Sequence, residues 1–233
     1  MNRNNFVFSF AWVVALLVAT PAMGQLNNFP ILALPSGDAA NTLGGGFGRG
    51  LNDLSGKDNS FLAGYARTGE SVSFGFNGGW VINVGPANST RIAVGSNVSY
   101  FIVDEEDSGV DVGLQLGLEY GSLNTDPRTN AWNIPFGVSI SASSEAGSNA
   151  VRYWVMPRIQ HTRQLEIATT PTTPVVPSTT FTDFGTSLGI SLQNEGGVGV
   201  GAYLDWLLTD DGTGTDSNGS RWLLGVAVFY TIQ

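Results

Sequence analysis

The sequence contains no cysteine, a single lysine (Lys57) and a single histidine (His161) among 233 residues. Without cysteine, the chain has no disulfides, thiolate metal sites, cysteine nucleophiles or lipoprotein anchor. One histidine excludes a histidine-rich metal site. The formal net charge of −9 argues against nucleic-acid binding, which needs a basic surface. Soluble β-proteins usually cover their outer face with lysine and glutamate, and this chain has too little lysine for that.

A long apolar run occurs only near the N-terminus. One basic residue precedes an apolar stretch at 6–19, and a proline at 21 and small residues at 22 and 24 follow it. These three parts predict a secretory signal peptide at residues 1–24. A membrane anchor is the alternative, but the stretch is shorter than the roughly 20 residues that a spanning helix needs. We therefore expect an exported chain with a periplasmic N-terminal segment at residues 25–40.

Apolar and small polar residues alternate through the rest of the chain. From residue 110 to residue 121, valine, leucine and tyrosine occupy the even positions, and aspartate, glutamine, glutamate and glycine the odd positions. Period-two alternation predicts an extended strand with two different faces. The pattern recurs and predicts about ten strands, with eight as the alternative, near residues 41–51, 60–67, 71–84, 91–103, 109–122, 131–141, 151–165, 183–193, 197–208 and 221–233.

The composition of the small-residue face indicates whether the apolar face is packed inward or contacts lipid. Glycine, serine, alanine and asparagine suit a crowded lumen better than a surface in bulk water. The strands also match the roughly 9 to 11 residues that a tilted membrane strand needs, and long connections alternate with short ones. The pattern predicts an all-β fold: a single closed antiparallel up-and-down transmembrane β-barrel at residues 41–233, with its apolar rows toward lipid and both termini in the periplasm.

Aromatic residues on the apolar face sort by strand direction. One group falls at the long-loop ends of the strands and another at the short-turn ends, as expected of two interfacial girdles. The predicted girdle comprises Trp80, Tyr120, Trp132, Phe184, Trp206 and Trp222 at the first end, and Tyr100, Tyr153 and Tyr230 at the second.

Charged residues on the opposite face are expected to line the lumen. Buried charges usually pair, so we expect Arg158 to meet Asp183 or another inward carboxylate. Such pairs either help to plug the lumen or line a narrow water path and bias its ion selectivity. Pro135 and Pro157 fall inside predicted strands, where a bulge or local break is expected. The predicted lumen charges are Arg49, Arg91, Asp111, Glu119, Arg152, Arg158, Asp183 and Asp205.

In its strand pattern, over residues 41–233, the chain resembles small bacterial outer-membrane β-barrel proteins of the OmpX, OmpW and opacity-protein type. The resemblance implies location in the outer membrane, contact with its lipid and lipopolysaccharide, and insertion by the barrel-assembly machinery. Such barrels often end in an aromatic residue that this machinery reads, whereas this chain ends in "VFYTIQ".

No residue pattern points to catalysis. Barrel hydrolases of the lipid-modifying kind would show His-x-Ser, whereas Arg163 stands at the serine position after His161; we interpret His161 as an interfacial, lipid-facing residue. Acidic stretches at 104–107 and 209–219 lack the spacing of a known calcium loop. The threonine- and proline-rich stretch at 167–181 predicts an extended outer loop.

We therefore expect no enzyme activity, no cofactor and no metal site. The expected function is a narrow passive pore, or a structural and surface-contact barrel whose surface ligand the sequence does not indicate. The alternatives are a secreted soluble β-sandwich or adhesin and, more remotely, a barrel-embedded hydrolase.

Overall fold

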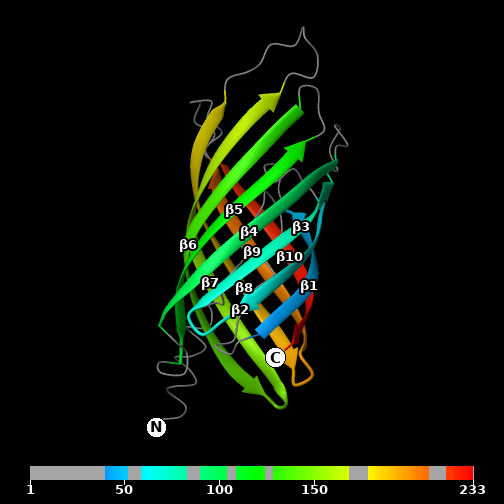
Figure 1. Cartoon of the computed structure of the whole chain (residues 1–233), viewed down its shortest axis with the longest axis vertical. Helices are drawn as coiled ribbons and strands as arrows, with labels where there is room; N and C mark the ends of the chain where they lie inside the picture. Colours follow the sequence, from blue (N-terminus) through cyan, green and yellow to red (C-terminus); the bar gives the residue numbers. More distant parts are fainter. Residues whose placement is uncertain are drawn as a thin grey trace.

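A computed structural model describes residues 40–51, 59–82, 90–103, 109–123, 128–167, 178–209 and 219–232. They form ten antiparallel strands that close into a barrel (Figure 1). The strands are β1 (Ala40–Gly50), β2 (Asn59–Thr68), β3 (Val72–Ile82), β4 (Thr90–Val103), β5 (Asp111–Leu123), β6 (Arg128–Ala146), β7 (Asn149–Ile167), β8 (Thr179–Asn194), β9 (Val198–Thr209) and β10 (Gly219–Ile232).

The barrel closes where the first strand pairs with the last. β1 and β10 run antiparallel from the Asn41–Ile232 pair to the Gly50–Leu223 pair. Every other strand pairs with its neighbours in the sequence, so the topology is up-and-down. The closed ten-stranded barrel confirms the predicted fold class, and the soluble β-sandwich alternative is wrong. Among the described residues, no helix is long and apolar enough to cross a membrane.

β6 and β7 are longer than the sequence pattern predicts. Both have 19 residues and meet in a two-residue turn at Gly147 and Ser148. Gly147 has a φ of 69°, a conformation that tight hairpin turns require and that glycine adopts without a steric penalty. This turn and the β8–β9 turn lie at the end of the barrel where the chain also ends (Figure 1); we call it the short-turn end, and the opposite end the long-loop end.

The two strand prolines interrupt the ladder without shifting it. The β5–β6 ladder lacks the two pairs that Pro135 and its neighbour Ile134 would make, and the register is the same on both sides. The β6–β7 ladder is interrupted in the same way beside Pro157. Proline lacks the N–H that a ladder needs, which explains both breaks. The register shift in the described strands lies between Phe101 and Val103 of β4 instead.

The outward face is apolar on all ten strands. Large hydrophobic side chains such as Phe76, Ile92, Leu116 and Val228 are each about half exposed. A continuous apolar belt of this kind is far larger than the patches that soluble monomers expose, so hydrocarbon must cover it. The barrel therefore spans a membrane.

Arginine placed in the middle of this belt is expected to destabilise the barrel. Leu116→Arg at mid-strand in β5 should lower the free energy of unfolding by about 2–4 kcal/mol, and Val72→Arg at the start of β3 by about 0–1 kcal/mol, because the penalty falls toward the interface. Urea unfolding in lipid vesicles measures both variants. Equal losses would contradict the position of the belt.

Candidate functional site

Six of the eight predicted lumen charges are buried on the inner face of the barrel. They come from three neighbouring regions of the wall, on β5, on β7 and on β8–β9, and are Asp111, Glu119, Arg152, Arg158, Asp183 and Asp205. The side chain of Arg91 lies outside the described part of the structure.

Arg49 corrects the prediction, because it lies on the outward face. Its side chain is exposed at the long-loop end of β1 and donates a hydrogen bond of 3.4 Å to Asn59 Oδ1. Its outward neighbour along β1 is Phe47, which contacts Phe61 of β2 with ring centroids 5.1 Å apart. The three glycines at 44–46 precede it and have no side chains to indicate which face is which, so the alternation was assigned wrongly.

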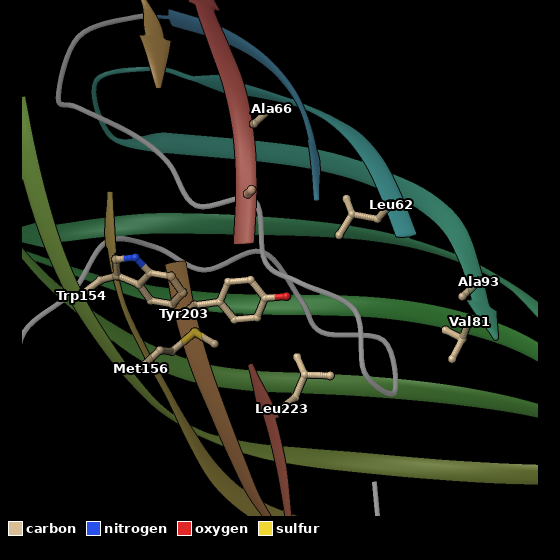
Figure 2. Close-up of a cluster of buried hydrophobic side chains, with 9 residues drawn as sticks. Leu62, Ala66, Val81, Ala93, Trp154, Met156, Tyr203 and Leu223 are labelled. Carbon is tan, nitrogen blue, oxygen red and sulfur yellow. The ribbon is translucent and has the colours of Figure 1, made fainter. Parts of the chain in front are cut away.

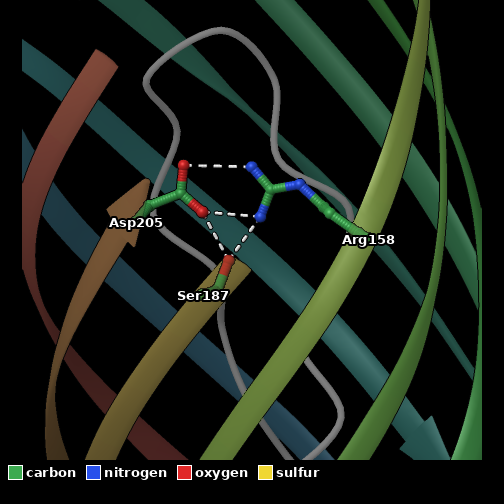
Figure 3. Close-up of polar contacts among 3 residues, drawn as sticks. All are labelled: Arg158, Ser187 and Asp205. Carbon is green, nitrogen blue, oxygen red and sulfur yellow. Dashed lines mark hydrogen bonds and ion pairs between the residues drawn. The ribbon is translucent and has the colours of Figure 1, made fainter. Parts of the chain in front are cut away.

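Arg158 pairs with Asp205 across an intervening strand. Its Nη1 and Nη2 donate to the two carboxylate oxygens of Asp205 at 2.5 and 3.0 Å. Ser187, on the strand between them, accepts a hydrogen bond from Arg158 and donates one to Asp205 (Figure 3). Two parallel N–H···O bonds are the strongest arrangement for an arginine and a carboxylate. The fork holds β7, β8 and β9 together from inside the barrel.

A second ion pair has the same layout on the other side of β7. Arg152 Nη2 donates to Asp111 Oδ2 of β5 at 2.5 Å. Ser141, on the intervening strand β6, donates to the same oxygen at 3.2 Å. β7 is therefore tied to β5 by one arginine and to β9 by the other.

Glu119 lies nearer the long-loop end of β5 than Asp111 and takes part in a network of weaker polar contacts. It is 1% exposed, and Asn133 Nδ2 donates to its Oε2 at 3.5 Å. Thr162 donates to Asn133 Oδ1 at 2.8 Å. Arg158 and Arg221 both lie within electrostatic range of the Glu119 carboxylate. Arg221 was not predicted as an inward charge, although its neighbour Trp222 was predicted to face lipid and Arg221 therefore has the inward parity.

A hydrophobic cluster lies inside the barrel and was not predicted either. The sequence predicts a lumen of small side chains, whereas Trp154 and Met156 of β7, Tyr203 of β9 and Leu223 of β10 are all buried inside it. They form one cluster with residues that are mostly smaller (Figure 2). Those residues are Leu62 and Ala66 of β2, Val81 of β3, Ala93 of β4 and Ala227 of β10.

Each large inward ring lies over a glycine of the adjacent strand. Tyr203 is directly opposite Gly225, and Trp154 is directly opposite Gly189. A Cβ atom at either glycine would overlap the ring. The Trp154 and Tyr203 rings also stack, with an interplanar angle of 24°. These glycines weaken the alternation of apolar and polar residues in their strands, and they also provide the space that the rings occupy.

The wall of β3, β4 and β5 is polar and less completely hydrogen-bonded. Asn77 Oδ1, Asn97 Oδ1, Ser99 Oγ, Gln115 Nε2 and Glu119 Oε1 are buried atoms without a protein hydrogen-bond partner. Buried polar groups of this kind usually bind ordered water. A pocket of about 70 Å³, partly lined by Arg152 and Phe229, lies at the short-turn end. The inner face thus combines an apolar cluster with polar positions on β3, β4 and β5.

The nine predicted girdle residues all lie at outward positions of their strands. Trp80 and Tyr100 are more than half exposed. Tyr120 and Trp132 are in contact with ring centroids 4.8 Å apart, and Trp206 and Trp222 at 6.1 Å. Six of the nine lie near the long-loop end and three near the other, as the strand directions require.

The remaining sequence predictions concern histidine, metal sites and undescribed segments. His161 is exposed on the outward face, and its Nδ1 is 3.0 Å from Thr182 Oγ1. Among the described residues, no three acidic or histidine side chains are grouped as a metal site. Residues 1–39, including the predicted signal peptide, lie outside the described residues, as do the acidic stretches 104–107 and 210–218, most of 167–181, and Gln233.

No protein-family model and no curated protein matches the chain. Solved structures similar to it include the beta domain of the Bordetella autotransporter BrkA, at 12% identity and a TM-score of 0.46, covering 83% of this chain and 99% of that one. A bacterial polysaccharide outer membrane secretin has 11% identity and a TM-score of 0.44, covering 83% and 66%. The outer membrane protease OmpT from Escherichia coli has 10% identity and a TM-score of 0.38, covering 86% and 99%.

Removing one partner of the Arg158–Asp205 ion pair is expected to destabilise the barrel more than replacing both partners with apolar residues. Arg158→Ala leaves the Asp205 carboxylate buried without its main partner and should cost about 3–5 kcal/mol of unfolding free energy. The double variant Arg158→Met with Asp205→Leu should lose less than the single variant. Urea unfolding in vesicles compares them; a double variant less stable than Arg158→Ala would contradict the argument.

The ring-over-glycine contact gives a prediction with an internal control. Gly225→Ala should displace the Tyr203 ring and cost about 1–3 kcal/mol, as overpacking does. Gly201→Ala, also on the inner face, should cost less, because its Cβ would meet its nearest neighbour, Ile190 O, at 3.4 Å. The unfolding midpoints of both variants test this, and equal midpoints would refute the contact.

Proposed function

We propose that the protein is an integral barrel of the bacterial outer membrane with a filled lumen. It serves as a structural and surface-contact protein rather than as an open pore, and it is not an enzyme. The observation that carries this proposal is the hydrophobic cluster on the inner face of the barrel, which includes side chains of β2, β3 and β4 as well as of β7, β9 and β10. Apolar side chains that meet across a lumen leave no continuous hydrated path for ions.

The outer membrane fits the remaining features. The apolar belt needs lipid on all sides, and the predicted signal peptide would export the chain. β1 begins and β10 ends at the same edge of the barrel. In this proposal that edge faces the periplasm, and the long connections face outward. Lipid and lipopolysaccharide are then its surroundings, and the assembly machinery inserts it. The threonine- and proline-rich stretch at 167–181 is a candidate surface-contact segment.

The placement of the histidine supports a non-enzymatic role. His161 is exposed on the outward face, whereas the buried carboxylates Glu119, Asp183 and Asp205 all lie on the inner face. A histidine separated from the carboxylates by the barrel wall is not available as a general base beside them.

A narrow water path is the second candidate function. It is favoured by the unpartnered polar atoms of Asn77, Asn97 and Gln115 on the inner wall of β3–β5. Water along this wall would give a small conductance, and the Glu119 carboxylate would favour cations.

Planar-bilayer conductance of the refolded mature chain separates the two functions. We expect no conductance steps from the unaltered protein. Trp154→Ala with Tyr203→Ala should introduce steps, because both rings lie in the cluster. Trp80→Ala removes a ring of the outward face and is the matched control. Heat-modifiable mobility in a gel shows that each sample is folded.

Steps from the unaltered protein would replace the filled barrel with the narrow pore. A folded double variant without conductance would show that the cluster does not close the lumen, and would contradict the proposal.

A further inference from the structure

A row of four outward side chains crosses β5 to β8 near the long-loop end. Tyr120 is paired with Trp132, Trp132 with Arg163, and Arg163 with Thr180. Partners in antiparallel strands point to the same side. The Tyr120–Trp132 contact belongs to the aromatic girdle, which marks the level where hydrocarbon meets headgroups. Because barrel strands are tilted, this row runs obliquely to the membrane plane. Thr180 lies four residues nearer the long-loop end of β8 than the girdle residue Phe184, so Thr180 and its partner Arg163 lie on the headgroup side of the girdle.

A second polar pair lies beside this row. His161 is directly opposite Thr182, and its Nδ1 is 3.0 Å from the threonine hydroxyl. His161 and Arg163 are two residues apart in β7, so their side chains share the outward face. We call His161, Arg163, Thr180 and Thr182 the β7–β8 patch. All four side chains are exposed.

The patch is basic in an acidic protein. The formal net charge is −9, yet among the described side chains no carboxylate lies on the outward face at the long-loop end. Glu119 of β5, Asp183 of β8 and Asp205 of β9 all face inward. A guanidinium at the edge of hydrocarbon, without a carboxylate beside it, is costly unless an anion or water neutralises it. The local charge thus fits an anionic ligand from the membrane side.

We infer that the β7–β8 patch binds the phosphate group of an anionic lipid in the leaflet at the long-loop end. Arg163 supplies a planar fork of N–H donors, which matches phosphate oxygens. The hydroxyl of Thr180 donates beside it, and His161 Nε2 lies outside the contact with Thr182. The Trp132 ring lies against the sugar or upper acyl chains of the same lipid. This inference rests on the proposed membrane location and names the lipid chemistry recognised there.

The test measures lipid binding by the refolded mature chain in a neutral detergent. The probes are a bis-phosphorylated glucosamine lipid (lipid A), the same lipid without phosphates, and inorganic phosphate, each titrated calorimetrically. Arg163→Gln should weaken lipid A binding about tenfold, the loss expected for one charged hydrogen bond. Arg163→Lys should retain part of it. Arg67→Gln is the matched control, because Arg67 is exposed on the outward face at the short-turn end of β2 and should leave the affinity unchanged.

The expected pattern is tight binding of lipid A and weak binding of the dephosphorylated lipid. Binding of inorganic phosphate with equal affinity would identify a free-phosphate site and overturn the lipid assignment. Equal affinities of Arg163→Gln and unaltered protein would overturn the patch, as would an equal loss in Arg67→Gln. If Arg163→Gln does not refold, Thr180→Val tests the patch instead. It removes the hydroxyl at similar side-chain volume and should also weaken lipid A binding.

Failure of the proposed function has a different signature. A chain that stays in solution without detergent and shows no heat-modifiable band would contradict the membrane barrel itself, whatever its lipid affinity.

Discussion

The hydrogen-bonded seam between β1 and β10 is the constraint on which the structure depends. An open ten-stranded sheet would carry two edges of unpaired N–H and C=O groups, and lipid offers such groups no partner. Pairing from Asn41–Ile232 to Gly50–Leu223 removes both edges. Only then does an outward face of valine, leucine and phenylalanine become favourable. Hydrocarbon covers the side chains, and the backbone N–H and C=O groups hydrogen-bond to one another. The inner face does not contact lipid, and its side chains are arranged by packing and ion pairing instead.

Two kinds of contact hold the inner face of the barrel together, which are side-chain packing and ion pairing. Large rings lie over glycines of the adjacent strand, as Tyr203 does over Gly225. Arginines of β7 reach past a serine to an aspartate two strands away, in both directions around the barrel. The ring–glycine contacts fill space, and the arginine–aspartate pairs neutralise charge. Both join residues of different strands, so both depend on the register in which the strands pair.

The sequence predicts the barrel well because strands such as 110–121 alternate strictly, and their outward rows stand out. It fails where alternation is lost. The glycines at 44–46 hide the facing of Arg49. Large hydrophobic residues occur on both faces of β9 and β10, so the buried Tyr203 and Leu223 were not predicted. The partner of Arg158 was left open, because a pair that spans three strands depends on two registers at once. Glycines opposite aromatic residues are the sequence signal that would have indicated the filled lumen.

The two arginine ties also make the barrel mechanically uneven. β5 to β9 are held together from inside by Arg152–Asp111 and Arg158–Asp205, whereas the inner faces of β1 to β4 carry mostly glycine, serine, alanine and asparagine. Lateral pressure from the surrounding lipid would therefore deform the β1–β4 side first. The braced half would keep its curvature, so the barrel would flatten along one side rather than shrink evenly.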